Sequence, residues 1–253
     1  YQENIKCICI DPPYNTGSDG FAYRDTLQHS SWMSMINDRL TLSRRLMSDD
    51  APIFVTIDDT ESHHLRALLE GVFGSKNFVT SIAWQKKVSP SNDAKWFSSD
   101  HDQILVASRD KNTWRPTRLA MNERQRAYYQ NPDNDPRGPW NSSTYTCNKS
   151  RRERPNLYYP IINPNTGKEV WPSESAVWAY SKEVYLQHVA QNLLYWGKDG
   201  KASKPRFKKF LNAAKPVVPR TIWPYSEVGH TQSASQALSD LLPRASFETP
   251  KPP

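Results

Sequence analysis

Apolar and polar residues alternate along the first part of the chain in blocks that predict strands and helices in turn. Residues 5–10 form a nearly continuous apolar run, which is typical of a strand covered on both faces of a parallel sheet. Two further apolar runs lie at 53–57 and 78–84, and apolar residues recur at helical spacing in 31–47 and 65–73. The order strand, helix, strand, helix, strand predicts an α/β doubly wound sheet.

Polar residues mark the ends of these elements. Asp58 and Asp59 follow the second strand and are placed to cap the next helix, and Gly74 is placed to end it. We prefer this capping role to a catalytic one, although both aspartates end a strand beside the first. A polar, basic loop is expected at 86–100, followed by a fourth strand at 103–108.

After Asp110 the composition changes, and residues 115–172 are rich in Pro, Asn, Arg, Tyr and Ser. A strand leading into a turn is expected at 161–167, and a short strand at 193–196. A helix is expected at 181–192. Its inward-facing residues would be Val184, Tyr185, His188 and Val189.

The chain is basic, with 33 Lys and Arg against 26 Asp and Glu and a net charge of +7. Such a balance suits a polyanionic partner without identifying it. A dense basic run interleaved with Phe207 and Phe210 favours phosphate contact over a merely solvated surface. The basic residues of this run are Lys201, Lys204, Arg206, Lys208 and Lys209. For Lys86 and Lys87, phosphate contact and simple solvation of the loop are equally favoured.

Several classes of protein are disfavoured. No apolar run is long enough to span a membrane, and the start of the chain lacks the pattern of a signal peptide. Cys7, Cys9 and Cys147 predict buried thiols rather than a disulfide framework or a metal site. The neighbours His63 and His64 lie on different parts of a helix surface, so we expect them to be solvated and expect no metal.

A carboxylate, two prolines and an aromatic ring follow the first strand as Asp11-Pro12-Pro13-Tyr14. Ligands of open α/β sheets bind outside the carboxyl ends of the strands. There Asp11 can accept a hydrogen bond from an exocyclic amine, the proline that follows Pro12 holds the Pro12 carbonyl in extended geometry, and Tyr14 can stack on a flat base. For the tetrapeptide alone, a proline-rich turn with Asp11 as a turn residue is the simpler interpretation.

The continuation changes this balance. Residues 11–17 are Asp-Pro-Pro-Tyr-Asn-Thr-Gly, and Phe21, Tyr23 and Asp25 follow. This stretch resembles the catalytic motif of amino-methyltransferases that use S-adenosylmethionine, in the form seen in adenine-N6 DNA methyltransferases, and specifically the modification subunit of type III restriction-modification systems. Residues 101–105 are similar to a further block of that family, which has Glu where this chain has Asp102.

The resemblance implies an order of parts with the catalytic block first, which is the beta order. Residues 1–110 would form the catalytic methyltransferase half-domain, a partial Rossmann-like doubly wound sheet. Residues 111–235 would form an inserted or appended, irregular α+β target-recognition region that binds DNA. Residues 236–253 would be a return segment leading to the cofactor block. That block, with its Phe-x-Gly-x-Gly turn, is not found, so we expect a piece of a longer protein that is inactive alone.

The resemblance also implies roles for individual residues. The catalytic set would be Asp11, Pro12, Pro13 and Tyr14, and the cofactor-binding set Asp11, Asn15, Thr16 and Lys251. The substrate would be double-stranded DNA, with an adenine flipped out of the helix. The expected cofactor is S-adenosylmethionine, the expected partners are a restriction subunit (nuclease and helicase) and a second copy of the intact protein, and the expected location is the bacterial cytoplasm.

Two alternatives stay open. Asp-Pro-Pro-Tyr also suits an amino-methyltransferase that acts on cytosine N4 or on RNA. A non-catalytic segment that binds DNA without chemistry would fit the missing glycine turn.

Overall fold

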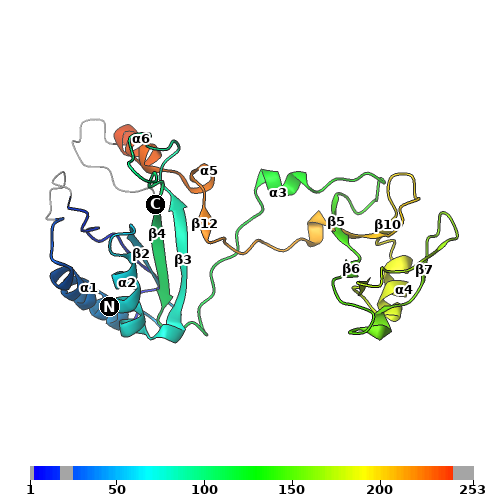
Figure 1. Ribbon diagram of the computed structural model, residues 1–253, viewed down its shortest axis with the longest axis horizontal. Coiled ribbons are helices and arrows are strands. Elements are labelled where there is room, and N and C mark those ends of the chain that lie inside the picture. The colour runs from blue at the N-terminus through cyan, green and yellow to red at the C-terminus, as the bar shows by residue number, and fades with distance from the viewer. Residues whose placement is uncertain (1–2, 18–24, 242–253) are drawn as a thin grey trace. The chain divides into compact units, whose positions relative to one another are not determined.

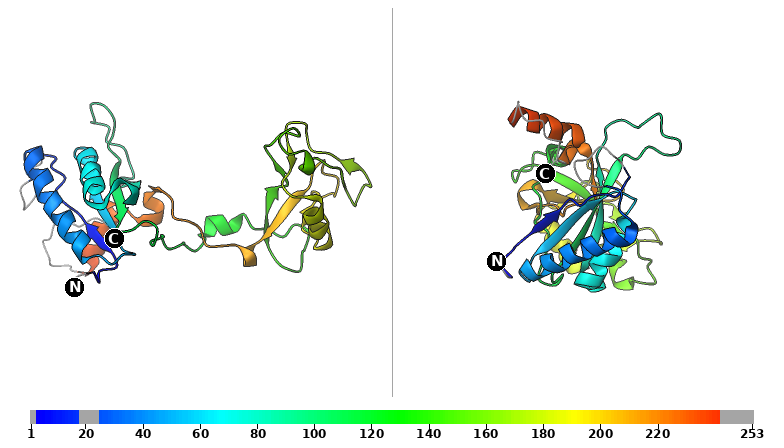
Figure 2. Two further views of the ribbon diagram at one scale, coloured as in Figure 1. Left: turned by 90° about the horizontal axis from the view of Figure 1, so that it is seen from below. Right: turned by 90° about the vertical axis from the view of Figure 1, so that its left-hand side faces the viewer.

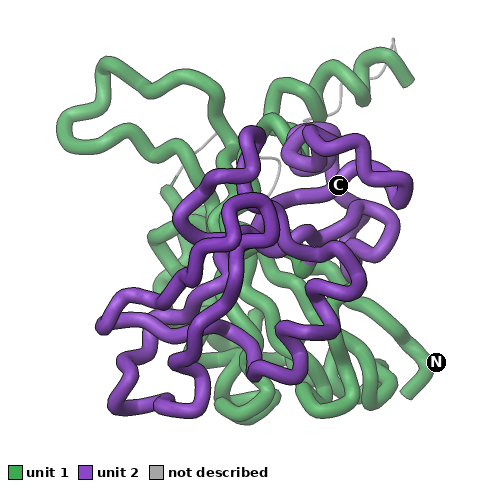
Figure 3. The backbone as a smooth tube through the Cα atoms, turned by 90° about the vertical axis from the view of Figure 1, so that its right-hand side faces the viewer, with its two compact units in different colours: residues 1–117, 218–253 green, residues 118–217 purple. Residues whose placement is uncertain are grey.

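The computed structural model describes residues 3–17 and 25–241. The chain divides into two compact units (Figure 3). Unit 1 comprises residues 1–117 and 218–253, and unit 2 comprises residues 118–217.

These divisions differ from the boundaries expected from sequence, which fell after Asp110 and after Ser235. Residues 218–235, expected in the target-recognition region, cluster with unit 1. The division is geometric, so the function of each range stays a prediction.

Unit 1 is built on a five-stranded mixed sheet (Figure 1). Its strands are β1 (Ile8–Ile10), β2 (Pro52–Ile57), β3 (Phe78–Gln85), β4 (His101–Ser108) and β12 (Ile222–Trp223). Their order across the sheet is β1-β2-β4-β3-β12. β1 is parallel to β2 and β12 to β3, whereas β4 is antiparallel to both β2 and β3. β1, β2 and β3 therefore point the same way, as the strand and helix order predicts, and only β4 is reversed.

Two helices, α1 (His29–Leu46) and α2 (Ser62–Phe73), form the connections between the parallel strands. They pack against each other and share one hydrophobic core with the sheet (Figure 1). The strand residues of that core alternate, because successive side chains of a strand point to opposite faces. They are Ile53, Val55, Ile57, Leu105 and Ala107. The α/β fold class is thus confirmed.

The opposite face of the sheet lacks a pair of long helices like α1 and α2 in the described part of the chain. Its core consists of Ile82, Trp84, Ile104 and Val106. Among the described residues, Trp114, Trp223 and Val228 pack against this core, and Val228 belongs to the short helix α5 (Tyr225–Val228). A longer helix, α6 (Thr231–Leu241), follows, with Ala234 buried.

The first strand is not covered on both faces in the described part of the chain. Ile8 and Ile10 pack against the core beneath α1 and α2, but Cys7 and Cys9 are exposed. The expectation of a doubly covered strand with buried thiols is therefore wrong for these positions. The reason is that β1 lies at the edge of the sheet, where one partner strand and one layer of helices meet it.

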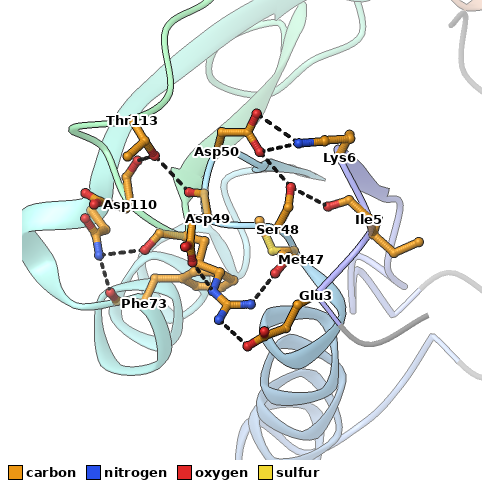
Figure 4. A network of polar contacts seen from close by, with 12 residues as sticks. Glu3, Ile5, Lys6, Met47, Ser48, Asp49, Asp50, Phe73, Asp110 and Thr113 are labelled. Atoms are coloured by element: carbon orange, nitrogen blue, oxygen red, sulfur yellow. Dashed lines mark hydrogen bonds and ion pairs between the residues drawn. The ribbon is translucent and has the colours of Figure 1, made fainter.

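A polar network clamps the chain just before β1 (Figure 4). Ser48 donates its backbone N–H to the carbonyl of Ile5 at 2.9 Å, and Lys6 pairs with Asp50 at 2.8 Å. Arg109, at the end of β4, donates to the Met47 carbonyl. The strand that carries the motif is therefore tied to the end of α1 before the motif begins.

The predicted caps of α2 are half correct. Gly74 ends the helix with a φ of 89°, a left-handed conformation that favours glycine. The N-cap, however, is Glu61 and not an aspartate. Asp58 accepts from the Thr60 N–H at 2.9 Å and Asp59 accepts from Gln103 at 2.7 Å, so both hold the turn before the helix instead.

Unit 2 is irregular and contains short elements. A three-stranded sheet has the order β10 (Leu194–Tyr195), β11 (Arg206–Phe210), β5 (Trp140–Thr144). The remaining helices and strands are α3 (Glu123–Ala127), β6 (Thr146–Cys147), β7 (Ile161–Ile162), β8 (Glu169–Val170), β9 (Val177–Trp178) and α4 (Lys182–Ala190).

The predicted elements of this unit at 161–167, 181–192 and 193–196 are confirmed as the β7-β8 hairpin, α4 and β10. Tyr185 of α4 joins an aromatic core, whereas Val189 is 47% exposed, so the prediction that Val189 faces inward is wrong. In the described residues of both units, no helix has the length and apolar character needed to cross a membrane.

Candidate functional site

Asp11 lies directly after β1, at the carboxyl end of the strand. Its side chain is exposed, and one of its carboxylate oxygens accepts a hydrogen bond from the Thr56 hydroxyl on β2. Pro12, the next residue, is buried. The structure thus holds an accessible carboxylate in place at the strand ends, where open α/β sheets bind ligands.

The next two residues of the motif are anchored to α1. Trp32 is fully buried and donates its indole N–H to the Pro13 carbonyl at 2.8 Å. Tyr14 is half-buried against the core formed by α1 and α2. Because the Pro13 carbonyl accepts this hydrogen bond, the direction of the backbone into Tyr14 is set by α1.

Asp25 organises the turn after Tyr14. Its side chain is 3% exposed and accepts three hydrogen bonds, from Asn15 N–H at 2.8 Å, from Thr16 N–H at 3.0 Å and from the Thr16 hydroxyl at 2.6 Å. Asn15 adopts a φ of 61°, in the left-handed region that asparagine tolerates better than most residues. The Asn-Thr-Gly part of the motif is therefore a turn closed around a buried carboxylate.

Glu61 supports the same turn from the start of α2. It is fully buried and accepts a hydrogen bond from the Asn15 side-chain amide at 2.6 Å. His29 and His64 each place Nδ1 at 2.7 Å from one of its two oxygens. Burial acts to raise the pKa of Glu61, but the bonds from Asn15, His64 and His29 outweigh it and hold the pKa below its usual value.

His29, Glu61 and His64 also bring two ring nitrogens and a carboxylate within 4.8 Å of one another, a set that suits a divalent ion. The hydrogen bonds already account for this grouping, since each carboxylate oxygen has an imidazole partner. His64 is thus part of a network around a buried carboxylate, rather than simply solvated as its position next to His63 suggested.

A second buried carboxylate, Asp102, lies at the start of β4. It is 1% exposed and pairs with the ammonium of Lys86 at 2.6 Å. Burial raises the pKa of Asp102, the bond from Lys86 opposes this, and the charges of Asp58 and Asp11 add to the rise. Asp102 therefore lies in the field of the motif carboxylate, and Lys86 neutralises charge beside the site.

Of the predicted phosphate-binding residues, Lys208 is in the wrong place for that role. Its ammonium is buried, with its side chain 1% exposed, and pairs with Asp133 at 2.5 Å and Asp135 at 2.8 Å. The bond from Arg137 is the largest influence on Asp135 and, with that from Lys208, holds its pKa far below the usual value. The ammonium of Lys208 is turned into unit 2, where it pairs with two carboxylates. Its role is therefore structural.

The other predicted contacts are placed as follows. Lys201, Lys204, Arg206 and Lys209 are exposed on unit 2, and Arg206 donates to the Ser142 hydroxyl at 2.8 Å. On unit 1, Lys86 is paired as described and Lys87 donates to the Ser91 hydroxyl at 3.0 Å. Lys251, Phe21 and Tyr23 lie outside the described residues.

Sequence reasoning missed the residues that hold the motif in place. The sequence places Asp25 in the motif and Trp32 within the apolar helical spacing at 31–47, and it singles out neither for this role, nor Glu61. The signal that could have found Trp32 is its indole N–H, which a buried tryptophan must pair. Glu61 gives no local signal for this role, because Asn15 and His29, two of its three partners, are distant in sequence.

Comparison with known proteins gives a family for the chain. Residues 5–253 match the model of the N6/N4 methylase family, described as DNA methylase. The chain is 30% identical over 281 residues to the type III restriction-modification enzyme StyLTI Mod subunit of Salmonella typhimurium, covering 100% of this chain and 42% of that protein. It is 26% identical over 313 residues to the EcoPI Mod subunit of Escherichia phage P1, covering 100% and 47%. The chain thus spans less than half the length of these two relatives.

The chain is also 27% identical over 277 residues to the type II methyltransferase M.KpnI of Klebsiella pneumoniae, covering 98% of this chain and 63% of that protein. Among solved structures it is similar to the cytosine-N4-specific PvuII DNA methyltransferase, at 10% identity and a TM-score of 0.34, covering 45% of this chain and 44% of the other. That likeness is too slight to extend to the base acted on. The family match spans nearly the whole chain and includes the Asp-Pro-Pro-Tyr motif at the strand ends. The chain belongs to the N6/N4 DNA methylase family.

Proposed function

We propose that the chain provides the catalytic half of a DNA methyltransferase that moves a methyl group from S-adenosylmethionine to N6 of a flipped adenine. The observation that carries this proposal is the exposed Asp11 carboxylate at the end of β1, followed by a segment that Trp32, Asp25 and Glu61 hold by hydrogen bonds. Adenine is favoured over cytosine because the Asn-Thr-Gly continuation resembles adenine-N6 enzymes and two relatives are type III Mod subunits.

In this proposal Asp11 and the Pro12 carbonyl accept hydrogen bonds from the exocyclic amine. Two acceptors on the amine protons keep the nitrogen lone pair directed at the methyl group, so much of the acceleration comes from positioning. Tyr14 stacks on the base and replaces part of the stacking lost on flipping, which costs a few kcal/mol. Asp11 need not be a strong base, because the nitrogen becomes cationic, and therefore acidic, as it gains the methyl group, and its proton then passes to Asp11 or to water.

The described residues fit one side of a cofactor pocket. S-adenosylmethionine, when bound, supplies an electrophilic methyl group on a positively charged sulfur. The exposed Asp11 carboxylate gives a negative potential that suits a cation at the strand ends. The side-chain donors of Asn15 and Thr16 already serve Glu61 and Asp25, so these residues would shape the pocket through their backbone rather than through those donors. Lys251 stays a proposed contact from sequence alone.

Double-stranded DNA is the proposed substrate, in a restriction-modification system in which a nuclease and helicase subunit and a second copy of the intact protein are the proposed partners. The exposed basic residues of unit 2 and Lys87 on unit 1 are the proposed phosphate contacts. Lys208 is excluded from them because its charge is buried and paired, and Lys86 because Asp102 neutralises it.

The test replaces Asp11 by Ala in the protein that carries this chain. We expect methyl transfer from labelled S-adenosylmethionine to unmethylated phage DNA to be lost, while DNA affinity stays within about twofold, since one exposed carboxylate is removed. Asp59→Ala is the matched control, an exposed strand-end carboxylate that bonds to Gln103. Near-normal transfer by the Asp11 variant would refute the proposed mechanism.

A further inference from the structure

The loop between β3 and β4, residues 86–100, is closed at its base and bridged part-way along by hydrogen bonds. Lys86 N–H donates to the Asp100 carbonyl at 2.9 Å, and Ser91 N–H donates to the Ser98 hydroxyl oxygen at 2.7 Å. Lys87 adds a bond to Ser91 at 3.0 Å. Figure 2 shows the segment projecting from the sheet of unit 1. We call residues 86–100 the finger.

Two aromatic side chains occupy the outer part of the finger. Trp96 is 81% exposed and Phe97 is 95% exposed, the two highest values among the described large hydrophobic residues. The ammonium of Lys95 lies 5.4 Å from the centre of the Trp96 ring. Neither ring contributes to a hydrophobic core, so their exposure has no explanation in the stability of unit 1.

The finger leaves the sheet at the carboxyl ends of the parallel strands, which is the side of the sheet where the motif also lies. β1 is parallel to β2, and β4 is antiparallel to both β2 and β3, so β3 ends at the same edge as β1. Asp11 follows β1 and Lys86 follows β3, and Lys86 pairs with Asp102, which opens β4. The base of the finger is therefore part of the same polar cluster as the motif carboxylate.

We propose that the finger inserts Trp96 and Phe97 into the DNA base stack next to the flipped adenine, with Lys95 and Lys87 against the phosphates. The inference rests on the proposed function. A base that leaves the helix exposes the faces of its neighbours, and an aromatic ring stacks on any base regardless of sequence. Lys95 beside the Trp96 ring, with Lys87 nearer the base of the finger, suits a polyanion better than an apolar protein surface, which is why DNA is the favoured occupant.

The experiment uses Trp96→Ala/Phe97→Ala and measures affinity by fluorescence anisotropy for a short duplex with one abasic position, without cofactor. Loss of aromatic stacking on a single base predicts affinity about 5- to 150-fold lower than that of the unchanged protein, and loss of both rings predicts a larger fall. Leu42→Ala is the control, because Leu42 is an exposed apolar residue on α1, 52% exposed and outside the finger. Trp96→Phe keeps a flat ring and should keep most of the affinity.

The unfolding midpoint of the double variant should equal that of the unchanged protein, since both rings are solvated. Affinity and methyl transfer equal to those of Leu42→Ala would overturn the inference. So would a change in self-association with unchanged DNA affinity, because the rings would then contact protein. Absence of transfer by the unchanged protein would instead refute the proposed function, and the abasic-duplex measurement, which needs no transfer, would still decide the role of the finger.

Discussion

Replacing Asp25 by Asn tests whether a buried carboxylate holds the motif turn in its working shape. The carboxylate accepts hydrogen bonds from Asn15 N–H, Thr16 N–H and the Thr16 hydroxyl. An amide has one acceptor oxygen, so its NH₂ group would face at least one backbone N–H. The change removes a charge-assisted bond and thereby leaves a buried donor unsatisfied, at a cost of about 2–4 kcal/mol for the turn.

If the turn had no other support, the transfer rate would fall by roughly 30- to 800-fold, at about 1.4 kcal/mol for each factor of ten. Trp32 and Glu61 also hold the turn, so we expect a fall of about 10- to 100-fold, with DNA affinity unchanged. Single-turnover transfer of labelled methyl groups measures the effect. Asp38→Asn, on an exposed position of α1, is the control. A rate within about threefold of the control would show that Asp25 does not organise the turn.

Three further predictions follow from named contacts. Trp32→Phe removes the bond to the Pro13 carbonyl and leaves a gap, so we expect a loss of about 2–4 kcal/mol in unfolding free energy and slower transfer; unchanged stability and rate would contradict the anchoring role. Lys208→Ala removes one of the two cationic partners of the buried Asp135, which keeps Arg137, and should cost about 1.5–3 kcal/mol of stability, whereas Lys209→Ala, an exposed neighbour, should cost little; equal melting temperatures would refute this. Burial lowers the pKa of His188 in the folded protein below its usual value of 6.5. The stability that depends on the neutral His188 ring is therefore fully present above pH 6.5 and is lost as the pH falls through the folded pKa, because the unfolded chain binds the proton first. Denaturant unfolding of His188→Gln should show a weaker loss of stability in acid, and a pH profile equal to that of the unchanged protein would contradict this role of His188.

The regular elements of unit 1 could be predicted from sequence because each has a local pattern. The helical spacing of apolar residues located α1 and α2, and the apolar runs located β2 and β3. The reversed insertion of β4 between β2 and β3 could not be predicted, because pairing partners depend on contacts between residues far apart in sequence. The exposure of Cys7 and Cys9 was missed for the same reason, since it depends on the edge position of β1.

The motif could be found from its residue types, but its support could not. Asp11 and Tyr14 carry recognisable chemistry, whereas Glu61 acts through partners in a loop and two helices. For the basic run that contains Lys208, the sequence predicted a functional contact that the structure does not support at Lys208. A local charge pattern predicted phosphate contact, and long-range pairing with Asp135 makes Lys208 structural.

The measurement that tests the central claim most directly is identification of the modified base. The protein that carries this chain would be incubated with unmethylated phage DNA and S-adenosylmethionine bearing a deuterated methyl group, and the DNA digested to nucleosides for mass spectrometry. We predict labelled N6-methyldeoxyadenosine, lost with Asp11→Ala. Labelled N4-methyldeoxycytidine would contradict the adenine assignment, and no labelled nucleoside would contradict the proposed activity.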